Sequence, residues 1–393
     1  MGANMTNKVA DRMKLLHTES AFQILAKANA LEAQGKSIIH LEIGQPDFKT
    51  PRNIIEAAYK AMNEGKTGYT PTPGVPLLRE TIASHCESYK GVKTSPEEIV
   101  VVPGGKPIMF YTMLMLTQPG DEVICPNPGF PIYESVINFS GAKVVPMPLL
   151  EKNNFSVDLD QLKKDINEKT KLIIINNPGN PTGGAIRKED IIAIADMIRG
   201  KGIYILSDEI YDRIVFEEKP LSIATLPDMK DWTIILDGFS KTYAMTGWRL
   251  GYGVMNEELA RHMTMLMVNS NSCAASVTQW AGIEALAGPQ DAVTEMVAAF
   301  RERRDYLIDA LNKIDGISCA MPGGAFYAFP NISSFGVSAS EFANRLLEEA
   351  GVAAAWGTAF GSFGEGFIRL SYANSLDNLK IAVERLDKFC KGL

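Results

Sequence analysis

Between residues 99 and 236 the chain repeats one pattern, in which short runs of apolar, β-branched residues alternate with longer segments of helical periodicity. Six of these runs predict strands, at residues 99–102, 122–125, 143–145, 172–175, 203–206 and 233–236. Because the runs are continuously apolar, we expect the strands to be buried on both faces. The last three runs begin about 30 residues apart, which is typical of the βαβ unit. The pattern predicts an α/β fold with a mostly parallel central sheet flanked by helices.

The pattern changes toward the C-terminus. Helices are predicted at residues 107–117, 188–201, 291–314 and 338–350, and a further helix at 19–34. Strand-like stretches at 324–329 and 366–371 accompany the later helices and indicate a smaller α+β domain. We therefore expect a large domain at residues 46–288 and a small domain formed by residues 1–45 and 289–393.

The composition of the chain limits the kinds of ligand and cellular compartment that we expect. The formal charge is -7, and no run of five Lys or Arg occurs, so nucleic acid and acidic membrane surfaces are not expected as partners. The five cysteines are scattered and odd in number, which favours buried thiols in a reducing cytoplasm over disulfides or a zinc site. The polar start of the chain and the lack of a long apolar run predict neither export nor a membrane span. A small-molecule ligand in the cytoplasm is the expectation.

Chemically useful residues follow four of the predicted strands, where ligands bind in open α/β sheets. The four segments are 103–106 (Pro-Gly-Gly-Lys), 176–184 (Asn-Asn-Pro-Gly-Asn-Pro-Thr-Gly-Gly), 207–211 (Ser-Asp-Glu-Ile-Tyr) and 237–249, which contains Lys241 and Arg249. An amide, a carboxylate, a phenol, an amine and a glycine-rich loop are therefore predicted to meet at one edge of the sheet.

Lys241 is the most informative of these residues. Burial and the nearby guanidinium of Arg249 would both lower the pKa of its ammonium, and the free amine would form a Schiff base with a carbonyl carbon. Asp208 ends an apolar strand and needs a cationic partner, which is either a ligand or an arginine of the chain. Gly104, Gly105 and Arg249 together suit a phosphate, although glycine turns before helices also occur for steric reasons.

A cofactor that requires a reactive lysine, a phosphate cradle and a buried aspartate is pyridoxal 5'-phosphate. Asn180 and Tyr211 are suited to donate hydrogen bonds to its phenolate oxygen. Four segments then resemble the signature blocks of the class I/II aminotransferases, at residues 177–183, 207–211, 240–252 and 368–373. The chain is similar to the aspartate aminotransferase-like branch of these fold type I enzymes from about Ile43 to its end.

This resemblance implies a role for each matching residue. Lys241 would form the internal aldimine and shuttle the proton of the substrate's α-carbon, while Asp208 would pair with the pyridine nitrogen and Tyr211 and Asn180 would bind the phenolate oxygen. The remaining implied contacts are the backbone N–H groups of Gly105 and Lys106 with Arg249 on the phosphate, Phe130 stacked on the ring, and Gly44, Asn180 and Arg369 at the substrate.

Tyr69 matches a tyrosine that reaches the phosphate of the neighbouring subunit, so the resemblance implies a homodimer with shared active sites. Some positions depart from the family pattern. Gly238 replaces a frequent serine, Asp237 a frequent asparagine and Trp356 a common proline, and Phe130 lacks the polar edge of Trp or Tyr. The added carboxylate of Asp237 would need to point away from the phosphate or be neutralised.

The activity expected from these residues is amino group transfer from an L-amino acid to a 2-oxo acid by a ping-pong mechanism. A C–S lyase or another specialised biosynthetic enzyme with the same cofactor is the alternative, because the motifs around the cofactor do not decide which bond breaks. A ligand sensor of a transcriptional regulator is disfavoured, since too few residues precede Gly44 for a DNA-binding module. The donor side chain is left open by the sequence.

Overall fold

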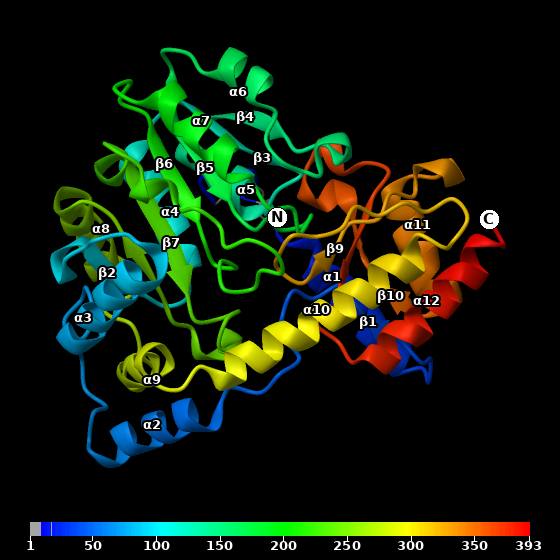
Figure 1. The fold of residues 1–393 in the computed structure, drawn as a ribbon, viewed down its shortest axis with the longest axis horizontal. Coiled ribbons are helices and arrows are strands. Elements are labelled where there is room, and N and C mark those ends of the chain that lie inside the picture. Colours follow the sequence, from blue (N-terminus) through cyan, green and yellow to red (C-terminus); the bar gives the residue numbers. More distant parts are fainter. Residues whose placement is uncertain (1–8, 17) are drawn as a thin grey trace, which may run out of the picture.

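A computed structural model describes residues 9–16 and 18–393 of the chain (Figure 1). Its centre is a seven-stranded sheet with the strand order β2-β8-β7-β6-β5-β3-β4. The strands are β2 (Ile99–Val102), β3 (Glu122–Asn127), β4 (Lys143–Pro148), β5 (Thr170–Asn176), β6 (Tyr204–Asp208), β7 (Thr233–Gly238) and β8 (Gly251–Val254). β8 runs antiparallel to both of its neighbours, β2 and β7, and the other six strands share one direction. The prediction of a mostly parallel sheet is confirmed.

Helices cover both faces of this sheet (Figure 1). The helices of this part are α2 (Arg52–Asn63), α3 (Pro76–His85), α4 (Lys106–Leu116), α5 (Ile132–Ser140), α6 (Leu159–Asp165), α7 (Lys188–Ile198), α8 (Glu257–Ser270) and α9 (Ser276–Ala287). Successive residues of a strand point to opposite faces, so Ile174 packs in one core with α4 and α8 while Ile173 and Ile175 pack in another with α7. The strands buried on both faces explain the continuous apolar runs.

Two details of the sheet differ from the sequence prediction. β4 lies at the edge of the sheet and is partly exposed, so the expectation of burial on both faces is wrong for this strand. β8 was not predicted, because Gly251 and Gly253 interrupt its apolar pattern and glycine is a weak strand former. The predicted helix at 188–201 ends early at Ile198, and Gly200 and Gly202 follow with positive φ angles.

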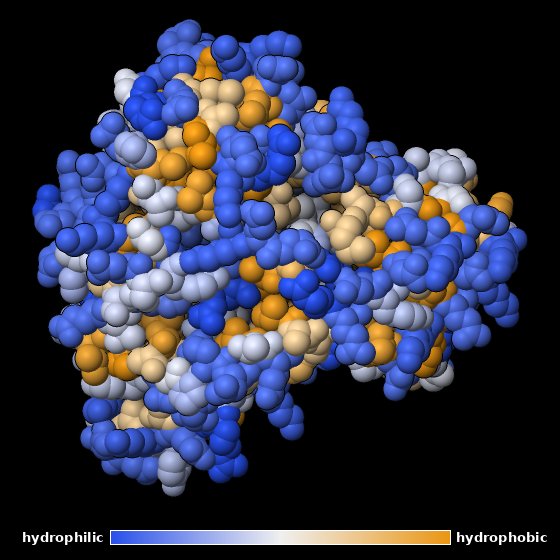
Figure 2. Space-filling model, in the orientation of Figure 1, coloured by the Kyte–Doolittle hydropathy of each residue, from blue (hydrophilic) through white to orange (hydrophobic). Residues whose placement is uncertain are grey.

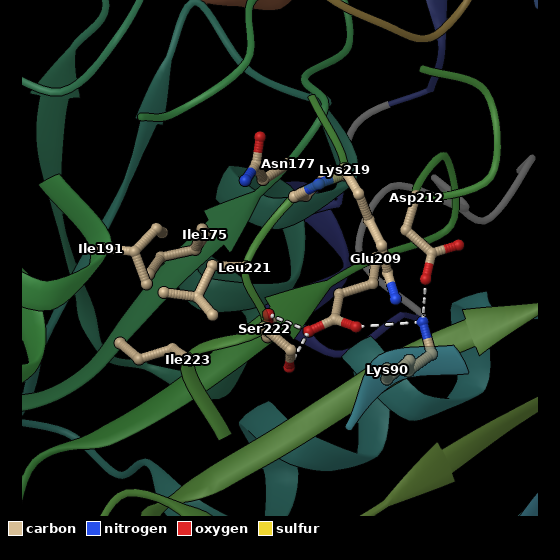
Figure 3. A pocket seen from close by; sticks show the side chains of 12 residues that line it. Lys90, Ile175, Asn177, Ile191, Glu209, Asp212, Lys219, Leu221, Ser222 and Ile223 are labelled. Atoms are coloured by element: carbon tan, nitrogen blue, oxygen red, sulfur yellow. Dashed lines mark hydrogen bonds and ion pairs between the residues drawn. The ribbon is translucent and has the colours of Figure 1, made fainter. Parts of the chain in front are cut away.

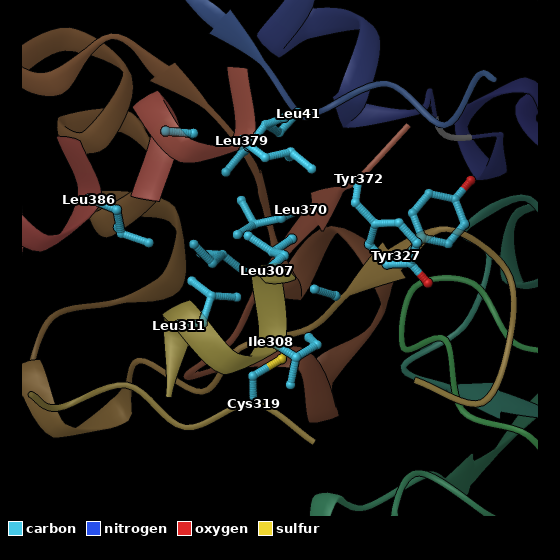
Figure 4. Close-up of a cluster of buried hydrophobic side chains, with 14 of the residues drawn as sticks. Leu41, Leu307, Ile308, Leu311, Cys319, Tyr327, Leu370, Tyr372, Leu379 and Leu386 are labelled. Carbon is cyan, nitrogen blue, oxygen red and sulfur yellow. The ribbon is translucent and has the colours of Figure 1, made fainter. Parts of the chain in front are cut away.

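A smaller group of elements packs beside the sheet domain. Its helices are α1 (Ser20–Glu32), α10 (Asp291–Leu311), α11 (Ala339–Arg345) and α12 (Leu376–Cys390), and its short strands are β1 (Ile39–His40), β9 (Tyr327–Ala328), β10 (Val352–Ala353), β11 (Ala355–Trp356) and β12 (Ile368–Ser371). The long helix α10 runs from α9 toward α12 (Figure 1). Side chains of α10, α12 and the short strands form a common core, which includes Leu307, Leu370 and Leu379 (Figure 4).

The helices predicted at 291–314 and 338–350 are both present, with α11 continuing into a π-helical turn at Leu346–Ala350. In the stretches predicted as strands at 324–329 and 366–371, only Tyr327–Ala328 and Ile368–Ser371 form strands. The division into domains at residues 45/46 and 288/289 stays a prediction.

The structure also tests the expectations about cysteines, membrane spans and metal sites. All five cysteines are free, and four are buried, whereas Cys273 is partly exposed and corrects the expectation that all are buried. Among the described residues, no helix is both long and apolar enough to cross a bilayer, and no group of three or more acidic, His or Cys side chains is arranged to hold a metal ion. On the face drawn in Figure 2, hydrophilic residues predominate and hydrophobic ones gather in separate small areas.

Candidate active site

A cavity of about 510 Å³ opens where the carboxyl ends of the sheet strands meet the smaller group of elements. The candidate residues of the sequence analysis that line it are Gly44, Gly105, Lys106, Phe130, Asn180, Asp208, Tyr211, Lys241, Arg249 and Arg369, whereas Gly104 and Tyr69 do not. Residues separated by more than 300 positions in the sequence, such as Gly44 and Arg369, thus line the same cavity. Tyr69 is 94% exposed and lies outside the cavity of its own chain.

Lys241 lies three residues after the end of β7, in the turn that follows this strand. Its Nζ donates a hydrogen bond to the backbone oxygen of Gly44 at 2.6 Å. Burial, and next the guanidinium of Arg369, lower the pKa of the Lys241 ammonium to about 8. Arg249 lowers this pKa as expected, but less than Arg369, which the sequence analysis did not name as a neighbour of Lys241. The fraction of the amine that is neutral and nucleophilic near neutral pH is therefore larger than for an ordinary lysine, although the ammonium stays the major form.

Asp208 is the last residue of β6 and is 5% exposed. Its carboxylate accepts hydrogen bonds from the Tyr133 hydroxyl at 2.5 Å and the Ile210 N–H at 3.2 Å. Burial raises the pKa of this carboxyl to about 6, against the lowering effect of these hydrogen bonds. No Lys, Arg or His of the described chain pairs with Asp208, so the alternative of an arginine partner is not found there. A cationic ligand group would supply the missing charge.

The N-terminus of α4 and Arg249 form the part of the cavity that suits an anion. Gly105 is the N-cap of α4 and Lys106 its first residue, so their N–H groups have no acceptor within the helix. Gly104 has a φ of +79°, and a Cβ at this position would lie 2.6 Å from Cζ of Arg249. The guanidinium therefore lies directly against the glycine turn. A helix N-terminus beside an arginine is a suitable site for a phosphate.

Arg369, on β12, is 4% exposed and faces the cavity. One terminal nitrogen donates to Oδ1 of Asn180 at 2.9 Å, and the other donates to the backbone oxygen of Glu42. Its Nε is buried and has no hydrogen-bond partner in the described structure. The loop that presents Asn180 is shaped by Asn176, whose side chain accepts from the Asn180 N–H at 2.8 Å. Arg369 is thus a fixed cation that can bind a carboxylate with its planar fork.

Two tyrosines of the cavity were missed by the sequence analysis. Tyr133, on α5, donates to Asp208, and the hydroxyl of Tyr327, on β9, lies 2.8 Å from the hydroxyl of Tyr211. The position of Tyr133, three residues after Phe130, was an available signal, since this spacing places both on one side of a helical turn. Tyr327 carries no such signal, because its contact with Tyr211 joins distant parts of the chain.

Lys106 and Phe130 occupy one end of the cavity. The Lys106 ammonium is paired with the carboxylate of Glu19, just before α1, and lies 5.5 Å from the centre of the Phe130 ring. Both residues were predicted here, Lys106 through its backbone and Phe130 as an aromatic surface. The ion pair with Glu19 was not predicted, and the start of helix α1 belongs to the lining of the cavity.

Asp237, the departure noted in the sequence, does not reach the cavity. One oxygen of its buried carboxylate accepts a hydrogen bond from the Tyr252 hydroxyl at 2.8 Å and lies 2.9 Å from Nζ of Lys90. Its other oxygen accepts from the N–H of Gly238 at 2.6 Å. The expectation of the sequence analysis is met, because the carboxylate lies outside the cavity and is paired with the Lys90 ammonium.

The fold and these residues define a class of protein: a fold type I α/β transferase with a lysine, an aspartate and an arginine in one cavity. Residues 36–386 match the family model for aminotransferase class I and II, and the chain belongs to this family. Its members depend on pyridoxal phosphate. Aminotransferase activity follows from this membership.

Individual relatives support the same class. An aspartate aminotransferase of Geobacillus stearothermophilus is 40% identical over 392 residues, which cover 98% of this chain and 99% of the relative. A solved aspartate aminotransferase from Thermus thermophilus with maleate has a TM-score of 0.93 at 35% identity, covering 99% of this chain and 100% of that one. An aromatic aminotransferase from Pyrococcus horikoshii has a TM-score of 0.90 at 35% identity, covering 97% and 98%. The fold is therefore shared by relatives named for different amino acids.

Proposed function

We propose that this chain transfers the amino group of an L-amino acid to a 2-oxo acid by a ping-pong mechanism, with Lys241 as the covalent attachment point of pyridoxal 5'-phosphate. The observation that carries the proposal is one cavity that holds the amine of Lys241, the carboxylate of Asp208 and the guanidinium of Arg369. The lowered pKa of Lys241, about 8, suits an amine that must attack an aldehyde and later carry a proton.

The residues present fit the cofactor. Asp208 is a buried carboxylate whose described partners are neutral, so it would hold the protonated pyridine nitrogen. Arg249 and the N–H groups of Gly105 and Lys106 would hold the phosphate, and Phe130 would cover the ring. Tyr211 and Asn180 would donate to the phenolate oxygen. Once bound, pyridoxal phosphate would supply the electron sink for the electron pair left at the substrate's α-carbon.

The chain's own residues then divide the remaining tasks. Arg369 binds the α-carboxylate of the substrate and fixes the amino acid beside Lys241, with Asn180 holding the guanidinium in place. Lys241 Nζ would accept the proton of the substrate's α-carbon, hold it and release it again, a type of proton transfer worth about 10²–10⁴ in rate. Gly44 lies against this position through its backbone oxygen.

We further propose a cytoplasmic homodimer in which Tyr69 completes the phosphate site of the partner subunit. Its 94% exposure in the single chain supports this proposal, since a large aromatic side chain is seldom fully exposed without a partner. The large domain would then comprise residues 46–288 and carry the cofactor, and the small domain, 1–45 and 289–393, would carry Arg369.

A half-reaction screen tests the function. The purified protein is loaded with pyridoxal phosphate, single amino acids are added, and absorbance follows the conversion of the bound cofactor to its amino form. Aspartate is the first donor to test, as several relatives are named for it, followed by aromatic amino acids and alanine. Initial rates at varied donor and acceptor should give parallel double-reciprocal lines.

The Lys241→Ala variant should lose steady-state transamination and keep its fold. Normal turnover by this variant would refute the role given to the lysine. Release of pyruvate and ammonia from a cysteine conjugate, without conversion of the cofactor, would favour the C–S lyase alternative.

A further inference from the structure

Lys90 is a buried ammonium that the proposed reaction does not use. It ends the π-helical turn Cys86–Lys90 that follows α3, and its side chain is 1% exposed. Its Nζ lies 3.0 Å from Oε2 of Glu209 and 2.9 Å from Oδ2 of Asp237, and it also pairs with the carboxylate of Asp212. Figure 3 shows Lys90 between Glu209 and Asp212, with the ammonium directed at both carboxylates.

The three carboxylates are direct neighbours of the site residues in the sequence. Glu209 follows Asp208, Asp212 follows Tyr211, and Asp237 stands four residues before Lys241. Glu209 and Asp212 belong to the loop after β6, whereas Asp237 lies at the end of β7. One ammonium therefore ties together the two segments that present the aspartate and the lysine of the cavity.

Further hydrogen bonds hold this cluster in place. Oε1 of Glu209 accepts from Ser207 at 2.9 Å and from Ser222 at 2.6 Å. The oxygens of Asp237 accept from Tyr252 and from the N–H of Gly238. Because these partners come from several elements, a carboxylate displaced by the loss of Lys90 would move its own loop and break more than one contact.

The charge balance shows how much depends on the lysine. Three buried carboxylates face a single ammonium, and Oδ1 of Asp212 has no hydrogen-bond partner in the described structure. Burial, opposed by Lys90, raises the pKa of Asp212. Removing the ammonium would leave three carboxyl groups in a low-dielectric space, where like charges repel strongly and unpaired ions are costly.

We infer that Lys90 is a positioning residue that sets the separation of Asp208 and Lys241 by holding the carboxylates beside them. The inference rests on the proposed function, because the separation matters only if both residues act on one cofactor. It also assigns a purpose to Asp237, since this carboxylate joins β7 to the cluster. Neither Lys90 nor its carboxylates line the cavity, so the effect passes through the two loops.

The test compares Lys90→Met with Lys230→Met. Lys230 forms a 2.8 Å ion pair with Glu98. It lies just before the start of β7, whereas Asp237 lies near the end of the same strand. Both variants lose a lysine from an ion pair, and only Lys90→Met loosens the loops beside the cavity. The readout is the rate at which apoprotein and pyridoxal phosphate form an adduct on Lys241, trapped with borohydride and located by mass spectrometry, below the melting temperature of each variant.

We expect Lys90→Met to lower the trapping rate and kcat by ~10-fold or more with a smaller change in KM, because misplacement of reacting groups acts on the chemical step. The pH midpoint of the bound cofactor's absorbance should shift as well. Lys230→Met should match the wild type in all of these measurements. Equal trapping rates, kcat and midpoints for Lys90→Met and wild type would overturn the inference.

The triple variant Lys90→Met/Asp212→Asn/Asp237→Asn keeps the test valid if Lys90→Met does not fold. It removes the repelling charges and still lacks the tie between the loops. The inference expects kcat to stay ~10-fold low in this variant, and recovery to within ~2-fold of wild type would refute it. A wild-type protein that forms the adduct on Lys241 and transaminates no donor would count against the proposed function alone, because trapping still reports on the positions of the two loops.

Discussion

Replacing Gly44 by alanine should disturb the cavity through one identifiable contact. A Cβ at position 44 would fall inside the contact distance of the Tyr327 hydroxyl oxygen, and would lie 3.1 Å and 3.2 Å from Cζ and Cε1 of the same ring. Tyr327 is 1% exposed, and the Arg369 guanidinium lies 4.6 Å from its ring centre. The ring has little room to move, so the hydroxyl or the backbone of residue 44 must shift.

The expected loss of folding stability in Gly44→Ala is the sum of two free-energy costs. Overpacking a buried site costs about 1–3 kcal/mol, and a shift of the Tyr327 hydroxyl would break its 2.8 Å contact with Tyr211, leaving a buried polar group unpaired at about 1–3 kcal/mol. We expect Gly44→Ala to lose about 2–6 kcal/mol of stability in total. Because the backbone oxygen of Gly44 accepts from Lys241, part of this cost should appear in kcat/KM, with tenfold for each ~1.4 kcal/mol.

Thermal melting and steady-state kinetics on one donor and acceptor pair measure both effects. Gly68→Ala is the matched control for melting, since no atom of its own chain lies within 4 Å of a Cβ at that position, and Tyr327→Phe alone is the reference for the kinetics. Tyr327→Phe removes the oxygen that causes the worst contact, so Gly44→Ala/Tyr327→Phe should be closer in stability to Tyr327→Phe than Gly44→Ala is to wild type. A Gly44→Ala protein with wild-type melting and kinetics, or one that Tyr327→Phe does not rescue, would refute the reasoning.

Three other predictions concern charged groups. The rate at which pyridoxal phosphate attaches to the apoprotein should rise with pH around a midpoint near 8, because only the neutral Lys241 amine attacks, and a midpoint near 10.5 would contradict the lowered pKa. Arg369→Lys should raise KM for amino acids by ~10-fold or more, since an ammonium cannot replace the bidentate fork, while the melting temperature reports separately on folding. Burial lowers the pKa of His40, but hydrogen bonds to Glu42 and Glu32 outweigh it and the net pKa is raised. This histidine should therefore stabilise the fold below about pH 6.5 and lose that contribution as pH rises through its folded pKa, so the stability advantage of wild type over His40→Gln should shrink from pH 5.5 to 8.

Much of the sheet could be predicted from the sequence, because its strands are buried on both faces and leave continuous apolar runs such as 172–175. The turns after those strands could be predicted as the site for the same reason, since parallel strands bring their carboxyl ends to one edge. Arg369, Gly44 and Phe130 were placed in the cavity only through the family resemblance. Nothing in the local pattern around them identifies a binding residue.

The buried lysine cluster could not be predicted. The segment of Lys90 is Cys-Glu-Ser-Tyr-Lys, which is typical of a solvated helix end, and burial of its ammonium depends on carboxylates more than 100 residues away. Asp237 gave a partial signal, because a carboxylate near a phosphate site requires a partner. That this partner is Lys90 depends on contacts between distant parts of the chain, and no local sequence pattern reveals such contacts.

Strand β8 was missed because glycine, which close packing beside the anion-binding turn requires, interrupts its apolar pattern. A Cβ at Gly251 would lie 2.7 Å from the backbone of both Gly104 and Gly105, so only glycine lets β8 approach the turn that begins α4. A Cβ at Gly238 would in turn lie 3.0 Å from Cα of Gly251 and 3.1 Å from the oxygen of Leu250. A serine at position 238 would thus press on β8. Gly251, one of the two glycines that interrupt the strand pattern, thus lets β8 pack backbone against backbone with the anion-binding turn, and Gly238 lets β7 pack closely against β8, at the cost of a side-chain hydroxyl at that position.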